Sequence, residues 1–283
     1  MGEVWTVLKL LRWTADYFAG RGIDSPRLDA ELLLAETLGL DRVGLYLNFE
    51  RPLQAEELAA YREKVRRRAG REPLAYVLGR TEFWSLPFKV TSAVLVPRPD
   101  TELLVEEALK RLPAATARLL DVGTGSGALA IALAHERPGC TVTAIDVSPA
   151  ALAVATENAR ANGVAERVAF IEADLAALPA GPFDLVVANP PYIPTGDLPA
   201  LMPEVRDFEP QLALDGGGDG LDACRALARQ AGTVLAPGGW LLVEIGIGQA
   251  EAVRGLLTAA GLTDIFTARD LSGIERVVGG NKS

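Results

Sequence analysis

The chain has 283 residues, of which 49% are hydrophobic and 23% charged, and its formal net charge is -9. This length suits two domains with well-buried cores, and the absence of low-complexity tracts excludes a disordered protein. No apolar run reaches the roughly 20 residues that a membrane helix needs, and Met1–Trp5 lacks the basic-then-apolar layout of a signal peptide. We therefore expect a soluble, cytoplasmic protein.

Charge is unevenly distributed along the chain. Residues 1–80 hold 13 Lys and Arg against 12 Asp and Glu, which leaves 15 against 25 for the remainder. An acidic second part argues against a broad footprint on nucleic acid. The first part contains a local basic run, for which a solvated helix face is the default interpretation and a patch for an acidic partner or RNA the alternative. The run consists of Arg62, Lys64, Arg66, Arg67, Arg68 and Arg71.

Histidine and cysteine are scarce. His135 is the only histidine, which excludes a His-based metal cage or catalytic triad of the usual kind, and we predict no metal. Cys140 and Cys224 are the only cysteines. Both lie in apolar patterns, so we predict buried thiols rather than a disulfide.

The first 75 residues or so predict a small all-helical domain. Leu8, Leu11, Ala15 and Phe18 recur at helical spacing. Further helices are expected from Pro26 to the stop at Gly39, from a cap at Asp41, and over Leu53–Ala69. Nothing here suggests catalysis, so the domain is expected to recognise a partner or to support packing.

Residues 81–98 are rich in aromatic and β-branched types and predict a short hairpin that links two domains, with strands over 82–90 and 93–96. We expect Phe83, Trp84 and Phe88 to form an interdomain core, with walling of a pocket as the alternative. After Pro97-Arg98-Pro99, either Asp100 or Thr101 is expected to cap a helix that runs to about Leu112.

A glycine-rich loop follows the first predicted parallel strand, Arg118–Val122, and precedes a helix over Ala128–Glu136. Alternate glycines in Gly123–Gly127 let the backbone approach a ligand, and the helix N-terminus adds donors and positive potential. The spacing Gly123-x-Gly125-x-x-Ala128 also matches the loose dinucleotide fingerprint. At this point an NAD enzyme stays open.

The next two strands end in acidic residues. Asp146 ends the second strand, where a carboxylate can accept both hydroxyls of a ribose. Asp174-Leu175 ends the third, where the acid can bind the exocyclic amine of an adenine. No constellation of His, Lys or Tyr suited to hydride transfer follows. Together with the glycine loop, these residues suit a cofactor of one nucleoside plus an amino acid, which is S-adenosylmethionine.

The fourth strand, Phe183–Ala188, is followed by Asn189-Pro190-Pro191-Tyr192. Open α/β sheets place their chemistry at this edge. The two prolines stiffen the chain, so the oxygens of Asn189 and Pro190 can accept from a planar nitrogen donor while Tyr192 offers an aromatic face. A Pro-rich turn that only caps the strand is the simpler alternative.

In this order the motifs resemble the class I methyltransferases that modify amide or amino nitrogens, whose signature is Asn or Asp, Pro-Pro and an aromatic. More closely, the chain is similar to the PrmC/HemK family, whose members methylate the glutamine of the Gly-Gly-Gln motif in bacterial class 1 peptide chain release factors. The similarity covers nearly the whole chain. The segments that carry it are 71–79, 82–88, 96–102, 121–127 and 189–193.

The resemblance implies an α/β fold of the class I methyltransferase (Rossmann-like) type: a mostly parallel sheet with helices on both faces, plus a small all-helical N-terminal domain. Residues 1–80 would then be a helical substrate-recognition domain, 81–98 a β-hairpin linker and 99–283 the S-adenosylmethionine-dependent methyltransferase domain.

The resemblance also implies roles for individual residues. Asn189 and Pro190 would accept the two N–H groups of the target glutamine amide, with Pro191 and Tyr192 beside it, so that Asn189, Pro190 and Tyr192 are the catalytic residues. Leu175 stands where some members have an aromatic, so stacking on the adenine is lost. The implied cofactor contacts are Gly123, Thr124, Gly125, Ser126 and Gly127 for the methionine part, Asp146 for the ribose, Asp174 and Leu175 for the adenine, and Asn189.

The rest of the chain is expected to support this scaffold. Asp215–Gly220 predicts a flexible turn before a helix, and Thr195–Pro210 a loop that covers the substrate. Glu244, inside the strand Gly239–Ile245, is interpreted as a satisfied structural carboxylate, with a pocket role as the alternative. A helix over 249–260 and two strands within 263–278 complete the chain.

Three other functions stay open on the sequence. Glutamine methylation of a ribosomal protein uses the same four-residue motif, which is Asn189–Tyr192 in this chain and is here called the tetrad. Adenine-N6 methylation of nucleic acid would need a basic groove, which the acidic second part disfavours. A regulator that binds the cofactor without turnover is the non-enzyme alternative.

Overall fold

The computed structural model describes residues 4–112 and 116–283. Met1–Glu3, which begin the segment without a signal-peptide layout, lie outside the described residues. The chain divides into two compact units. The first comprises Met1–Gly79 and Pro203–Phe208, and the second comprises Arg80–Met202 and Glu209–Ser283.

The first unit, here called the helical unit, packs its helices around one apolar core. Its caps follow the sequence: Asp41 accepts from the backbone N–H of Gly44 at 2.6 Å, and Gly39 ends its helix in the left-handed region at φ 64°. The short helix α5 was not predicted. The helices are α1 (Val7–Ala19), α2 (Pro26–Leu38), α3 (Arg42–Leu47), α4 (Ala55–Ala69), α5 (Leu74–Leu78) and α9 (Pro203–Phe208).

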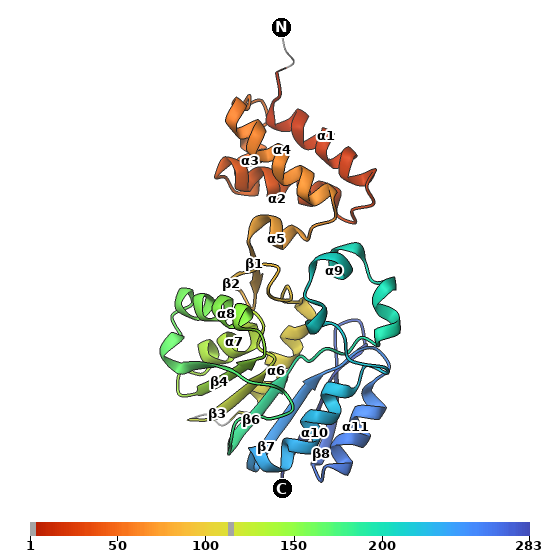
Figure 1. Ribbon diagram of the computed structural model, residues 1–283. Coiled ribbons are helices and arrows are strands. Elements are labelled where there is room, and N and C mark those ends of the chain that lie inside the picture. The colour runs from red at the N-terminus through yellow and green to blue at the C-terminus, as the bar shows by residue number, and fades with distance from the viewer. Residues whose placement is uncertain (1–3, 113–115) are drawn as a thin grey trace. The chain divides into compact units, whose positions relative to one another are not determined.

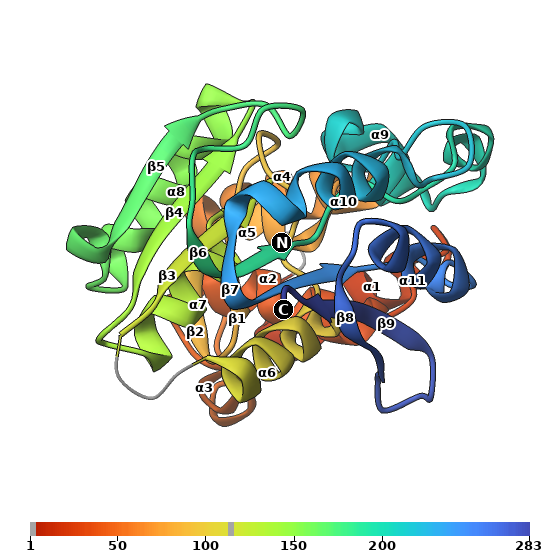
Figure 2. The ribbon, with the colours of Figure 1, turned by 90° about the horizontal axis from the view of Figure 1, so that it is seen from below.

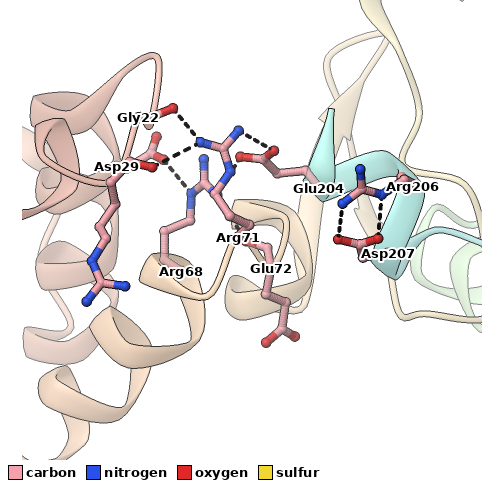
Figure 3. A network of polar contacts seen from close by, with 9 residues as sticks. Gly22, Asp29, Arg68, Arg71, Glu72, Glu204, Arg206 and Asp207 are labelled. Carbon is pink, nitrogen blue, oxygen red and sulfur yellow. Dashed lines mark hydrogen bonds and ion pairs between the residues drawn. The ribbon is translucent and has the colours of Figure 1, made fainter. Parts of the chain in front are cut away.

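Helix α9 is held in the helical unit by a buried network of charges (Figure 3). The carboxylate of Glu204 lies 3.0 Å from Nη1 of Arg68 and 2.6 Å from Nη2 of Arg71. Arg68 also lies 2.7 Å from Asp29 in α2. The expected covering loop therefore contains a helix that belongs, by its contacts, to the helical unit.

The basic run is largely neutralised within this unit. Arg66 pairs with Glu63, and Arg67 pairs with Glu72. Arg68 is buried, at 7% exposure, so the expected description as one solvated helix face is wrong for it. Only part of the run faces solvent, because its other members hold the unit together.

The second unit, here called the sheet unit, is built on a sheet of seven strands (Figure 1). The strand order is β5-β4-β3-β6-β7-β9-β8. The strands from β5 to β7 run parallel, and β9 is antiparallel to both of its neighbours. The strands are β3 (Arg118–Val122), β4 (Thr141–Asp146), β5 (Val168–Glu172), β6 (Phe183–Ala188), β7 (Leu235–Glu244), β8 (Thr263–Arg269) and β9 (Glu275–Asn281).

Helices cover both faces of the sheet (Figure 2). Leu119 and Leu120, neighbours in β3, pack into opposite cores because side chains alternate along a strand. The predicted mostly parallel sheet between two helical layers is confirmed. One face carries α6 (Glu102–Arg111), α7 (Ala128–Glu136) and α8 (Pro149–Ala161), and the other carries α10 (Asp222–Val234) and α11 (Ala250–Ala259).

The hairpin consists of β1 (Arg80–Phe83) and β2 (Leu86–Lys89) and is part of the sheet unit. Phe83 and Phe88 lie edge to face and are buried against α6 and α7, so the expected interdomain core is wrong. Residues 93–96 do not form the expected second strand. Short 3₁₀ helices complete the unit: η1 (Pro99–Thr101), η2 (Ala165–Arg167), η3 (Thr195–Ala200) and η4 (Gln211–Ala213).

Two further predictions from composition can be compared with the structure. Among the described residues, no helix combines the length and apolar character needed to span a membrane. Cys140 and Cys224 are both buried free thiols, as predicted.

Candidate active site

The site lies where parallel strands end side by side. The register pairs Val122 of β3 with Ile145 of β4 on one side and with Ala188 of β6 on the other. The residues next along the chain, Gly123, Asp146 and Asn189, therefore meet at one edge of the sheet. Strand β5 ends beside β4 and brings Asp174 to the same edge.

A cavity of about 400 Å³ opens at this edge. Most of the site residues predicted from the sequence line this cavity, and they come from the ends of all four strands. Those that line it are Gly123, Gly125, Asp146, Asp174, Leu175, Asn189, Pro190 and Pro191. The nominated residues that do not line it are Thr124, Ser126, Gly127 and Tyr192.

The glycine loop has its shape because Gly123 and Gly125 adopt φ angles of 73° and 54°, which disfavour any other residue. Thr124 and Ser126 stabilise the loop from behind. The Thr124 hydroxyl donates to Oδ2 of Asp121 at 2.6 Å, and the Ser126 carbonyl accepts from the buried side chain of Asn158 at 2.9 Å. They shape the loop without facing the cavity.

Two carboxylates stabilise the loop further. Asp146 accepts from the backbone N–H groups of Gly125 and Ser148, each at 2.9 Å. Asp121 is buried, and burial raises the pKa of its carboxyl to about 7, although the hydrogen bond from Thr124 lowers it. Its Oδ1 has no hydrogen-bond partner. Asp121 does not line the cavity, so its role here is to support the loop from below through Thr124.

A further wall of the cavity was predicted only in part, because the sequence left open that the hairpin segment, 81–98, could wall a pocket. Residues 93–95 and 210–213 contribute to it. Arg98 joins the two segments, because its Nη2 donates to both carboxylate oxygens of the buried Glu209 at 2.6 and 2.7 Å. These partners are 111 positions apart in the chain, and neither belongs to a motif that would pair them.

Asn189 is oriented by a residue from another element. Its Nδ2 donates to the hydroxyl of Thr101 at 3.0 Å. Thr101 was expected as one of two possible helix caps, but it is followed by α6 without any capping bond from its side chain. Because the amide nitrogen of Asn189 is engaged, its oxygen is available to the cavity.

The turn at 215–220 supports the tetrad from outside the cavity. A Cβ on Gly216 would lie 2.8 Å from the carbonyl of Pro191, and one on Gly220 would lie 2.3 Å from the carbonyl of Tyr192. The backbone N–H of Gly216 donates to the carbonyl of Ile193 at 2.8 Å. The predicted turn is present, and its glycines permit close packing against the tetrad.

Tyr192 is half-buried beside the cavity. Burial, then the nearby charge of Glu244, raises the pKa of its phenol, so it stays neutral at ordinary pH. The described residues contain no group of three or more His, Cys, Asp and Glu side chains that could hold a metal ion.

Known proteins match both parts of the chain. The PrmC N-terminal domain family matches residues 9–79, and the methyltransferase small domain family matches residues 99–200. The chain is 55% identical to the release factor glutamine methyltransferase of Geobacter sulfurreducens, over 98% of this chain and 97% of that protein. The chain belongs to the release factor glutamine methyltransferase family.

A second member of the family, from Caulobacter vibrioides, is 45% identical over 98% of both chains. Among solved structures, the hMettl16 catalytic domain in complex with the MAT2A 3'UTR hairpin 6 superposes with a TM-score of 0.60 at 15% identity, over 77% of this chain and 81% of that one. That likeness concerns the fold alone. Membership of the family identifies the chain as a glutamine methyltransferase and excludes the NAD enzyme that the glycine loop had left open.

Proposed function

We propose that this protein transfers a methyl group from S-adenosylmethionine to the side-chain amide nitrogen (N5) of the glutamine in the Gly-Gly-Gln motif of class 1 peptide chain release factors, and so modulates translation termination. The observation that carries the proposal is the orientation of Asn189, whose Nδ2 is engaged by Thr101 while the residue lines the cavity. Since release factors act on ribosomes, we place the reaction in the cytoplasm.

The cavity fits the proposed cofactor. Gly123 and Gly125 of the glycine loop would hold the methionine part, Asp146 the ribose, and Asp174 with Leu175 the adenine, and all five residues line the cavity. When bound, the cofactor would supply an electrophilic methyl group on a sulfonium centre and would leave as S-adenosyl-L-homocysteine. The methylated amide nitrogen would then lose its extra proton to water.

The residues of the tetrad prepare the target nitrogen. An amide nitrogen is a weak nucleophile because its lone pair is delocalised into the carbonyl, so most of what the protein can contribute is position. The side-chain oxygen of Asn189 and the carbonyl of Pro190 can each accept one of the two N–H groups. These bonds fix the lone pair and strengthen as the nitrogen gains positive charge, so they favour the transition state over the ground state.

We further propose that residues 1–80 recognise the release factor. Support comes from large apolar side chains exposed on the described surface of α1, α2 and α3, among them the aromatic residues Trp13 and Tyr46. Aromatic residues are enriched in protein interfaces. The other exposed apolar side chains are Leu28, Val43 and Leu47. The internally paired arginines of the basic run contribute little to this surface.

The experiment that tests the function offers three substrates in parallel: a class 1 release factor, ribosomal proteins and DNA or RNA, each with labelled S-adenosylmethionine. We expect label in the release factor, and loss of most turnover in Asn189→Ala with only modestly weaker cofactor binding. Label in either of the other substrates alone would overturn the choice of substrate. Cofactor binding without any transfer would favour the non-enzyme alternative.

A further inference from the structure

Behind Asn189, on the side away from the cavity, lies a buried carboxylate that the proposed reaction does not use. Glu244 is the last residue of β7 and is 2% exposed. The register pairs Ala188 of β6 with Val243 of β7, so the next residues, Asn189 and Glu244, are neighbours at the strand ends. The side chains of Thr101 and Asn189 both lie close enough to the Glu244 carboxylate to lower its pKa, against the effect of burial.

When Glu244 is ionised, the hydrogen-bond donors and acceptors of these three side chains can be paired in one consistent way. A carboxylate only accepts, whereas a hydroxyl has one hydrogen to donate. The Thr101 hydroxyl accepts from Nδ2 of Asn189, so its own hydrogen is available for Glu244. Both groups next to the Asn189 amide are then acceptors, and the amide must turn its NH₂ toward them.

We propose that Glu244 and Thr101 are positioning residues that set the direction of the Asn189 amide. The carboxylate orients the hydroxyl, and together they hold the NH₂ of Asn189, which leaves its oxygen for the N–H of the target glutamine. Without the acceptors, the amide is free to rotate and can present a donor where an acceptor is needed. This inference rests on the proposed function, because it assumes that Asn189 accepts from the target amide.

The sequence interpretation of Glu244 as a satisfied carboxylate is incomplete. Its Oε2 has no hydrogen-bond partner. Isolated buried carboxylates are costly, which gives a reason for a role beyond packing. Three charged or titratable groups face it from neighbouring elements. They are Asp100 before α6, Tyr192 in the tetrad and Arg276 in β9.

The pH profile offers a readout that a purely structural role would not change. Burial raises the pKa of Glu244 to about 7, although Thr101 and Arg276 lower it. A protonated Glu244 can donate to Thr101 and so release the constraint on Asn189. Turnover should therefore rise as pH increases through about 7. Arg276, which forms an ion pair with Asp100 at 2.9 Å and whose pKa lies above its ordinary value, stays charged over that range, and Tyr192 stays neutral.

The test compares Glu244→Gln and Thr101→Val with the matched control Thr101→Ser, using a class 1 release factor and S-adenosylmethionine. Misplacement of a reacting group costs between about tenfold and about a hundredfold in rate. We expect kcat to fall by at least that lower factor in Glu244→Gln and Thr101→Val, with KM for the release factor and Kd for the cofactor nearly unchanged. Thr101→Ser should keep its turnover, because it keeps the hydroxyl.

Two further results would separate positioning from support. The pH step should shrink in Glu244→Gln, because Asp121 is another group whose pKa is raised to about 7. Glu244→Gln should also cost little when added to Thr101→Val, since both act through the same hydroxyl. Normal kcat in both variants, or additive losses in the double variant, would overturn this inference alone. A wild-type protein that leaves the release factor unmethylated would overturn the proposed function and this inference with it.

Discussion

The side chain of Gln249 holds the backbone of Tyr192 in place. Its Nε2 donates to the Tyr192 carbonyl at 2.9 Å, while its Oε1 accepts from the backbone N–H of Gly246 at 2.8 Å. One side chain thus connects the tetrad after β6 with the loop after β7. The rigidity of the tetrad therefore depends on this side chain as well as on its two prolines.

Gln249→Glu tests this contact, because it keeps the acceptor for Gly246 and replaces the donor that Tyr192 needs. Two oxygens would then face each other, which should displace the tetrad. We expect kcat for release-factor methylation to fall about tenfold or more, with cofactor affinity close to normal. The check is steady-state kinetics beside calorimetry. Unchanged kcat would show that the tetrad is held without this bond.

A matched pair of glycine variants tests the packing behind the tetrad. A Cβ in Gly220→Ala would lie 2.3 Å from the carbonyl of Tyr192, at a φ of 77°. Gly218→Ala has nothing within 4 Å of its new Cβ. We expect Gly220→Ala to lose turnover and about 1–3 kcal/mol of stability, and Gly218→Ala to match wild type. Equal activity in the two variants would contradict the account of this turn.

The predicted and observed structures agree where the local pattern is strong. The run Phe183–Ala188 forms β6 with the predicted bounds, and Ala128–Glu136 forms α7. Because parallel strands end together, knowing the strands was enough to bring Asp146 and Asn189 to one cavity. The core of the site thus follows from hydrophobic periodicity and chain order.

What the sequence could not supply are partners that tertiary packing chooses. Thr101 is a residue type that commonly caps helices, yet its hydroxyl accepts a hydrogen bond from Asn189, which lies 88 positions away. Glu204 lies in a polar segment whose sequence predicts a loop, but ion pairs with Arg68 and Arg71 hold it in the helical unit. Side chains such as these have several partners open to them, and only the folded chain decides between them.

The network at Glu204 predicts a local, pH-dependent stability. Burial opposes its charge, but its hydrogen bonds, including those from Arg68 and Arg71, outweigh this and hold the pKa below the ordinary value of 4.5. A lowered pKa means stability that is present above that value and lost as pH falls through the lower one. Burial raises the pKa of Asp29 in the same network, which acts in the opposite sense, so a variant is needed to isolate Glu204.

Hydrogen exchange of the α2 and α4 amides in Glu204→Gln measures the stability that Glu204 contributes to the helical unit. At neutral pH we expect faster exchange, equivalent to about 1–3 kcal/mol for one broken partner in a buried charge network, and a difference from wild type that shrinks in acid. Glu63→Gln, which breaks an exposed pair with Arg66, is the control and should exchange like wild type. A constant difference at all pH values would contradict the assignment.

Asp146 should act on cofactor binding rather than on turnover. It accepts from two backbone N–H groups and lines the cavity. We expect Asp146→Ala to weaken S-adenosylmethionine binding about tenfold to a hundredfold, because charge-assisted hydrogen bonds are lost, with kcat largely restored at saturating cofactor. Calorimetry and kinetics at raised cofactor measure both quantities. Normal affinity in this variant would remove Asp146 from the site.

The most direct measurement is tandem mass spectrometry of a class 1 release factor after incubation with this protein and S-adenosylmethionine. We predict the added mass of one methyl group on the glutamine of the Gly-Gly-Gln peptide, and none with Asn189→Ala. An unmodified glutamine with intact cofactor binding, or full methylation by Asn189→Ala, would contradict the account.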